Sequence, residues 1–186
     1  MNPGDVFYIQ AGASGVGLAA IQLAKMMGAK VITTIGSSEK AEFVKKLGAD
    51  IVLNYHTDDV LAAIKANPPT VALDCIGGKL MGECFKEMVF GGRWIMIATM
   101  AGGETNINLE TVWRKRIRLI GSTLRSRTSE EKCRIMQALK RELWQLFSAG
   151  KLVNHIHAVF PIAEVEAAHG VLRRAENTGK VVLTFR

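Results

Sequence analysis

A glycine-rich loop near the start of the chain constrains its fold more than any other feature. The loop reads Gly12-Ala-Ser-Gly-Val-Gly17 and lies between the apolar run Val6–Ala11 and a helical pattern that ends near Met27. A strand, a tight glycine turn and a helix start form the layout that binds the pyrophosphate of a dinucleotide. The sequence therefore predicts a dinucleotide-binding site, with a plain tight turn as the alternative interpretation.

Strand and helix signals alternate through the first two thirds of the chain. The apolar runs are continuous, which is typical of strands in a parallel sheet that is covered on both faces. Strands are expected at Val6–Ala11, Lys30–Ile35, Ile51–Leu53, Thr70–Asp74, Arg93–Ala98 and Ile117–Ser122. Helices are expected at Gly17–Met27, Ser38–Leu47, Asp58–Ala66, Lys79–Val89 and Leu109–Lys115. Ser37 or Ser38, with Glu42, is expected to cap the second helix. We predict an α/β fold with a Rossmann-type, doubly wound parallel sheet of six strands.

The pattern changes after Arg125. Residues Thr128–Ala149 predict one long amphipathic helix, because apolar side chains recur along one stripe. A strand at Asn154–Phe160, a short helix at Ile162–Arg174 and a last strand at Lys180–Phe185 are expected to follow. We therefore expect a cofactor-binding domain over residues 1–127 and a helix-strand-helix-strand appendage over residues 128–186.

Composition narrows the function classes. No apolar run reaches about 18 residues, so no transmembrane span and no membrane partner are expected. Cys75, Cys84 and Cys133 are widely spaced, which favours reduced thiols in a cytoplasmic protein over disulfides or a zinc site. The net charge of +7 suits a protein that holds a polyphosphate. We interpret the basic cluster Arg114–Arg118 as a solvated helix end rather than a nucleic-acid site, because only Trp113 stands beside it.

The glycine loop departs from the usual G-x-G-x-x-G pattern at its middle position, which is Ser14. Gly12 and Gly17 keep the outer spacing, and Gly15 adds a further small residue. Glycines are needed here because a Cβ atom would block the close approach of the backbone to the phosphates.

The end of the second strand indicates which dinucleotide is bound. NAD sites usually carry a carboxylate there, whereas this chain has Gly36-Ser37-Ser38-Glu39-Lys40 with none at the strand end. Ser37 or Ser38 can donate hydrogen bonds to a 2′-phosphate, and Lys40 offers a charge, so NADP(H) is predicted. The alternative for Lys40 is a solvent-exposed helix lysine. Tyr55 is either an adenine-stacking residue or a half-buried loop tyrosine.

Taken together, these residues resemble a branch of the medium-chain dehydrogenase/reductase superfamily. The branch is that of the NADPH:quinone oxidoreductases, which are zeta-crystallin-like proteins, and the p53-inducible subgroup is the most similar. The matching stretches are Gln10–Lys25, Lys46–Asp50, Asp74–Gly78, Gly91–Trp94, Gly121–Arg127 and Gly179–Leu183. The resemblance runs over nearly the whole chain, and Ser14 is itself usual in this branch.

The resemblance implies a set of cofactor-binding residues. The glycine loop would lie on the pyrophosphate, Ser37, Lys40 and Tyr55 would hold the adenosine end, and Lys180 would approach the phosphates. The loops after the last three strands of the sheet would flank the ribose and the nicotinamide. The full set is Gly12, Ser14, Gly15, Val16, Gly17, Gly36, Ser37, Lys40, Tyr55, Cys75, Ile76, Gly77, Ala98, Thr99, Ser122, Thr123, Leu124 and Lys180.

The resemblance also implies an activity, which is zinc-independent hydride transfer from NADPH to quinones or activated alkenes. It identifies no catalytic acid in this chain. Family members carry a GroES-like domain ahead of the glycine loop, so the chain is expected to be a short form and residues 128–186 a remnant of that domain. Its last strand is then expected to lack a partner. A homodimer is expected through pairing of the strand near Arg118–Thr123. The alternative function is a catalytically inactive NADPH-binding or interaction module.

Overall fold

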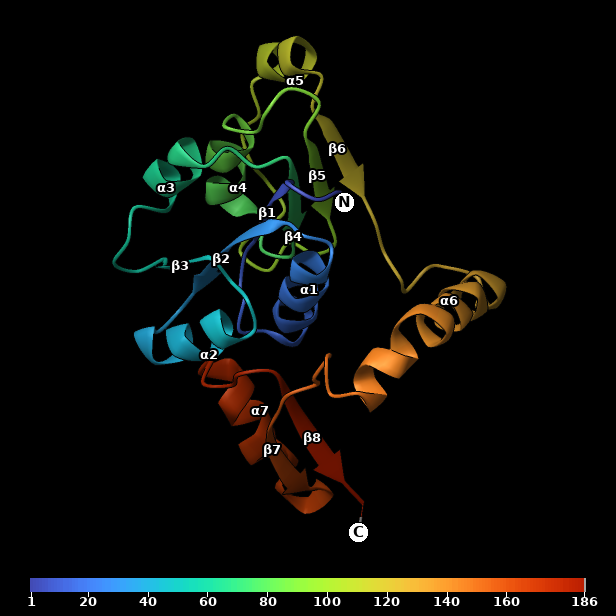
Figure 1. Cartoon of the computed structure of the whole chain (residues 1–186). Coiled ribbons are helices and arrows are strands. Elements are labelled where there is room, and N and C mark those ends of the chain that lie inside the picture. Colours follow the sequence, from blue (N-terminus) through green and yellow to red (C-terminus); the bar gives the residue numbers. More distant parts are fainter. Residues whose placement is uncertain (186) are drawn as a thin grey trace.

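The computed structural model describes residues 1–185, and its centre is a parallel sheet of six strands (Figure 1). The strand order is β3-β2-β1-β4-β5-β6, and each neighbouring pair is parallel. This order starts in the middle of the sheet and winds outward in both directions, which is the doubly wound arrangement that the sequence predicts. The strands are β1 (Val6–Ile9), β2 (Lys30–Ile35), β3 (Ile51–Asn54), β4 (Val71–Asp74), β5 (Arg93–Met96) and β6 (Arg118–Gly121).

Helices cover both faces of the sheet and create two separate hydrophobic cores. On β1, Phe7 and Ile9 belong to one core, while Tyr8 belongs to the other. The first core is completed by α1 (Gly15–Met26) and α2 (Ala41–Lys46), and the second by α3 (Val60–Ala66) and α4 (Gly78–Phe85). Because side chains alternate along a strand, both faces must be apolar, and this explains the continuous apolar runs in the sequence.

The second core is built around aromatic side chains. Trp94 on β5 is fully buried, and its ring centroid lies 6.0 Å from that of Tyr8 and 5.8 Å from that of Phe85. Its indole nitrogen donates to an oxygen of Asp74 at 3.0 Å, so the only polar atom of the tryptophan ring is satisfied inside the core. Beyond β5, α5 (Leu109–Lys115) leads into the edge strand β6.

The expected cap of the second helix is wrong. Residues Ser38–Lys40 form a 3₁₀ turn, and α2 starts only at Ala41. The Ser37 side chain makes no capping hydrogen bond, and the Ser38 hydroxyl accepts from the side-chain amide of Asn54 at 3.3 Å. The contact with the end of β3 therefore takes the place of the local capping box.

The long helix after the sheet is α6 (Ser129–Ser148), close to the expected range. It begins with a capping box, in which Thr128 accepts from the Glu131 amide and the Glu131 carboxylate accepts from the Thr128 amide. No residue of α6 is buried within the described chain. Figure 1 shows this helix set apart from the sheet, and its apolar side chains Ile135, Leu139 and Phe147 are between a third and a half exposed. No helix among residues 1–185 combines the length and the apolar character needed to cross a bilayer.

The C-terminal elements form a second, small sheet. Strands β7 (Ile156–Pro161) and β8 (Lys180–Thr184) are parallel neighbours, and a 3₁₀ turn (Ile162–Glu164) and α7 (Val165–Arg173) connect them. The expectation that the last strand lacks a partner is therefore wrong, because β7 supplies one through a local crossover. The division into domains at residue 127 stays a prediction.

Candidate functional site

The glycine loop joins the end of β1 to the start of α1. Ser14 caps α1, and its hydroxyl oxygen accepts from the Gly17 amide at 3.0 Å. A Cβ atom on Gly17 would collide with the carbonyl oxygens of Ala11 and Gly12, and one on Gly12 would collide with the Thr33 side chain. At Gly17 two backbone segments approach too closely for any side chain, and at Gly12 the loop packs directly on the Thr33 side chain, so the tight turn requires glycine at both positions.

The start of α1 offers hydrogen-bond donors that have no acceptor. Among residues 1–185, the amides of Gly15 and Val16 donate to no backbone or side-chain oxygen, as is usual in the first turn of a helix. The first turn carries no acidic residue. The Lys180 side chain lies over this end, with its nitrogen 2.6 Å from the point where a Cβ of Gly15 would stand. Amides, helix dipole and ammonium together form a site for an anion.

The C-terminal sheet is attached directly to this loop. The amide of Gly179 donates to the carbonyl of Ala13 at 2.8 Å, and Ser14 and Gly179 form an isolated parallel bridge. This pairing places Lys180, the first residue of β8, above the loop. The predicted residues Gly12, Ser14, Gly15, Val16, Gly17 and Lys180 thus lie together.

The predicted adenosine end lies where β2 and β3 finish. Gly36 and Ser37 follow β2, and the Tyr55 hydroxyl lies 2.8 Å from the point where a Cβ of Gly36 would stand. Tyr55 is about half exposed, and its ring centroid lies 4.3 Å from that of His56. The partly exposed Tyr55 ring therefore lies beside Gly36, at the end of β2.

Lys40 has a partner that the sequence does not indicate. Its ammonium donates to the carbonyl of Ala175, in the turn between α7 and β8. Burial lowers the pKa of Lys40, and the neighbouring Glu39 opposes that shift. The predicted 2′-phosphate lysine thus contacts the C-terminal sheet as well as standing near the end of β2.

The remaining predicted residues lie on three loops at the carboxyl ends of β4, β5 and β6. Backbone hydrogen bonds join the first two loops, from Met100 to Cys75 at 3.3 Å and from Ala101 to Ile76 at 2.8 Å. The Ser122 amide donates to the Met96 carbonyl at 2.8 Å, which joins the third loop to the end of β5. The structure therefore brings this set to one edge of the sheet: Cys75, Ile76, Gly77, Ala98, Thr99, Ser122, Thr123 and Leu124. Burial, followed by the nearby Asp74 carboxylate, raises the pKa of the Cys75 thiol, so the thiol form is favoured.

Asp74 organises this edge, and the sequence interpretation gave it no such role. It is fully buried at the end of β4. One carboxylate oxygen accepts from the amides of Ile76 and Gly77 at 2.7 and 2.9 Å and from the Gln10 side chain at 3.3 Å. The other accepts from Trp94. A lone carboxylate at the end of an apolar strand is the signal that could have revealed it, because a buried charge requires such partners.

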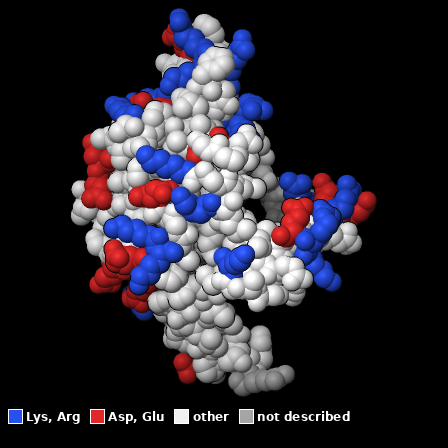
Figure 2. All heavy atoms as spheres, viewed as in Figure 1, with Lys and Arg blue, Asp and Glu red and all other residues white. Residues whose placement is uncertain are grey.

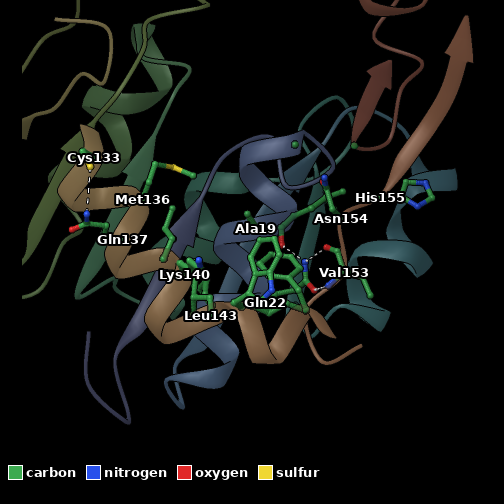
Figure 3. Close-up of a pocket in the computed structure, with 18 residues that line it drawn as sticks. Ala19, Gln22, Cys133, Met136, Gln137, Lys140, Leu143, Val153, Asn154 and His155 are labelled. Carbon is green, nitrogen blue, oxygen red and sulfur yellow. Dashed lines mark hydrogen bonds between the residues drawn. The ribbon is translucent and has the colours of Figure 1, made fainter. Parts of the chain in front are cut away.

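An apolar groove of about 640 Å³ lies beside the glycine loop, between α1 and α6. Leu18 and Leu23 contribute from α1, and Met136 and Leu143 from α6. Figure 3 shows α6 beside α1, and hydrogen bonds join Gln22 of α1 to Val153 at the α1 side of the groove. The groove reaches Gly15 and Gly179, so it borders the anion site without containing it.

The basic cluster at the end of α5 is largely paired within the chain. Arg114 forms an ion pair with Glu110 at 2.7 Å, and Lys115 donates to the carbonyls of Lys86 and Met88. Arg116 lies 5.4 Å from the ring centroid of Phe90. Figure 2 shows acidic groups interspersed among the basic ones over the visible face. These contacts support the interpretation of a solvated helix end.

The sheet order and the glycine loop define a class, that of dinucleotide-binding α/β domains. Comparison with known proteins narrows the class. The family profile described as zinc-binding dehydrogenase matches residues 15–141. The chain therefore belongs to the zinc-binding dehydrogenase family and, within the medium-chain dehydrogenase/reductase superfamily, to its quinone oxidoreductase-like branch.

Three relatives illustrate the match. Quinone oxidoreductase-like protein 2 of Bos taurus is 25% identical over the whole chain and 54% of its own length. Quinone oxidoreductase 1 of Escherichia coli (strain K12) is 27% identical over 98% of the chain and 58% of its own length. The structure of the quinone oxidoreductase from Coxiella burnetii is 34% identical, with a TM-score of 0.79 over 100% of this chain and 54% of that one. The chain spans about half the length of the curated relatives it matches.

The family name mentions zinc, so the metal-ligating side chains matter. Within residues 1–185, no three His, Cys, Asp or Glu side chains are grouped so as to hold a metal ion. Cys75 and Cys84 are buried and Cys133 is exposed, and all three are free thiols.

Proposed function

We propose that this chain binds NADP(H) and serves hydride transfer to quinones or activated alkenes without zinc. The observation that carries the proposal is the candidate anion site at the start of α1, where two amides without an acceptor among residues 1–185 lie beside the Lys180 side chain. Membership of a quinone oxidoreductase-like branch supplies the reaction class. A bound nicotinamide supplies the hydride, and the protein binds and orients it.

The residues present fit such a cofactor. Gly12 and Gly17 allow the tight turn that brings the loop backbone to the start of α1, and the α1 dipole favours negative charge there. The edge organised by Asp74 provides the loops on which a nicotinamide ribose would rest. Cys75 and Ser122 directly follow β4 and β6, and Thr99 is the third residue after β5.

The end of β2 supports a preference for NADP(H) over NAD(H). Gly36 and Ser37 follow the strand, so no carboxylate stands there to repel a 2′-phosphate. Lys40 is held nearby by the Ala175 carbonyl, and a phosphate is a stronger acceptor for its ammonium than a carbonyl. We therefore assign Lys40, Ser37 and Tyr55 to the adenosine end.

Calorimetric titration with NADPH and with NADH tests the proposal. Tighter binding of NADPH is expected, and Lys40→Met is expected to weaken NADPH binding about tenfold while leaving NADH binding unchanged. Lys45→Met is the matched control, because this lysine lies on α2 and its ion pair within the described part of the chain is with Glu42. Failure of the unsubstituted chain to bind either dinucleotide would overturn the proposal.

The second candidate function is an NADPH-binding module without turnover. It is favoured by the site itself, because the residues described at the start of α1 and at the end of β2 account for cofactor binding and none of them is assigned as a catalytic acid. Consumption of NADPH with an ortho-quinone, followed by absorbance, separates the two candidates once binding has been measured. Binding without turnover would favour the module.

We further propose a cytoplasmic homodimer formed through β6. All four residues of this edge strand are exposed, including Leu119 and Ile120, and one side of the strand has no neighbour among residues 1–185. Exposed strand edges pair readily with another copy. Light scattering after size exclusion is expected to give twice the 20.3 kDa chain mass, and a monomer would contradict the dimer.

A further inference from the structure

Gln22 is a buried polar side chain on α1 whose hydrogen bonds leave the helix. Only 7% of the residue is exposed. Its side-chain oxygen accepts from the Val153 amide at 2.9 Å, and its nitrogen donates to the Val153 carbonyl at 3.0 Å (Figure 3). The same nitrogen donates to the Leu18 carbonyl at 3.0 Å. The side chain of Gln22 thus bonds to both the amide and the carbonyl of Val153, in the segment between α6 and β7.

The segment held by Gln22 in turn holds the residues above the anion site. Two residues after Val153, the His155 carbonyl accepts from the Lys180 amide at 3.0 Å. His155 also packs against Phe43, with ring centroids 4.5 Å apart. The pairing of β7 with β8 then starts at Ile156 and Lys180. The position of Lys180 is therefore fixed from the His155 side as well as from the glycine loop.

These contacts attach the C-terminal region both to the glycine loop and to the middle of α1. At the start of the helix, Gly179 is bonded to Ala13, and Lys180 lies over Gly15. Further along the helix, Gln22 holds Val153, seven residues and about 10 Å from Gly15 at 1.5 Å per residue. The C-terminal region is thus attached at two points along α1, in addition to its contacts with Lys40 and Phe43. The attachment at Gln22 restricts how far the segment that bonds to Lys180 can move relative to the start of α1.

We propose that Gln22 is a positioning residue for Lys180, which it keeps over the phosphate-binding end of α1. This inference rests on the proposed function, since the role concerns a phosphate-bearing cofactor. Lys180 forms no ion pair within residues 1–185, so the position of its backbone sets the region that its ammonium can reach. Within residues 1–185, the side-chain hydrogen bonds of Gln22 go to Leu18 and Val153, and neither is a predicted cofactor-binding residue.

Paired variants test the proposal through NADPH affinity and its dependence on salt. Gln22→Leu removes all three hydrogen bonds while keeping a side chain of similar size. Gln137→Leu is the matched control, because Gln137 lines the same groove from α6 and its side-chain hydrogen bond within residues 1–185 goes to Cys133, on the same helix. We expect Gln22→Leu to weaken NADPH binding three- to tenfold and to flatten its salt dependence, as Lys180→Met does. Gln137→Leu is expected to change neither.

The double variant Gln22→Leu with Lys180→Met gives the decisive comparison. If Gln22 acts through Lys180, the second substitution adds nothing once the ammonium is gone, so the double variant binds like Lys180→Met alone. A further loss equal to that of Gln22→Leu alone would show a general structural role and overturn the inference. Gln22→Glu, which keeps the acceptor for the Val153 amide but loses both donated bonds, is expected to bind with intermediate affinity.

Folding and the proposed function are checked separately. Circular dichroism and amide hydrogen exchange show whether each variant is folded, and exchange at the Lys180 amide is expected to rise in Gln22→Leu but not in Gln137→Leu. Unsubstituted protein that binds no NADPH would overturn the proposed function, and the positioning role with it. If the unsubstituted protein binds NADPH and the folded Gln22→Leu variant binds it with the same affinity, the positioning role alone would be overturned.

Discussion

The six-stranded region and the region that follows it are stabilised in different ways. Residues 1–122 contain both hydrophobic cores, with strands covered on each face. After residue 122, Leu152 and Ala168 are the only buried hydrophobic residues in the described chain, and α6 has none. The later region is held instead by hydrogen bonds to the glycine loop and α1. The first region carries its own stability, whereas the position of the second depends on a few specific contacts.

The sharpest test of this comparison uses two tryptophans. Trp94 is fully buried, and Trp144 on α6 is 60% exposed. Trp94→Ala is expected to cost about 3–5 kcal/mol in the free energy of unfolding, because it leaves a cavity and removes the donor to buried Asp74. Trp144→Ala is expected to cost less than about 0.5 kcal/mol. Urea unfolding followed by circular dichroism measures both, and equal losses would contradict the comparison.

A pair of glycines tests the contact between the two regions. On Gly17, an added Cβ meets backbone oxygens that cannot move, so Gly17→Ala is expected to cost about 1–3 kcal/mol of stability. On Gly15, the three nearest atoms all belong to the flexible end of the Lys180 side chain, so Gly15→Ala is expected to leave the free energy of unfolding nearly unchanged. Displacement of Lys180 should nevertheless weaken NADPH binding in Gly15→Ala. A Gly15→Ala variant as unstable as Gly17→Ala would show that the two regions are more tightly packed than the structure indicates.

The first region could be predicted well from sequence because local signals encode it. The bounds of β2 and α5 are those that the sequence predicts, and the strand order follows from the alternation of strands and helices. Each apolar run is long enough to identify its element without knowledge of its neighbours. The glycine loop then locates the carboxyl ends of the strands, where the predicted site residues lie.

The contacts that the sequence did not indicate join residues far apart in the chain. Gln22 and Val153 are 131 residues apart, and Asp74 and Trp94 are 20 apart on neighbouring strands. Lys40 and Ala175 meet only because the C-terminal sheet reaches the end of β2. No periodicity encodes such pairs. The pairing of β7 with β8 was missed for a different reason, since the last strand was expected to need a partner from another domain.

The smallest expected effect is the dependence of stability on acid pH. One carboxylate in each region, Asp50 in the first and Glu131 in the second, tests whether the two regions unfold separately. Burial raises the pKa of Asp50, but the Val31 amide at 2.7 Å and the Lys25 ammonium at 2.9 Å outweigh it, so the net pKa lies below the usual 3.8. In Glu131, hydrogen bonds from Thr128 lower the pKa of a carboxylate that caps α6. In both cases the folded pKa is depressed, so the stabilisation is present above the unfolded pKa and is lost as the pH falls through the folded one.

Removal of the two carboxylates should therefore have different effects, one on global unfolding and the other on local hydrogen exchange. Asp50 joins α1 to β2 in the first region, so Asp50→Asn is expected to lower the free energy of unfolding at neutral pH and to flatten its decline below pH 4. Glu131→Gln is expected to leave global unfolding unchanged and to raise only the hydrogen exchange of the first turn of α6, since this helix contributes no buried residue. Urea unfolding across pH 2–7, together with amide exchange, measures both. A global loss of stability in Glu131→Gln would mean that α6 unfolds together with the sheet, and the division between the two regions would then not hold.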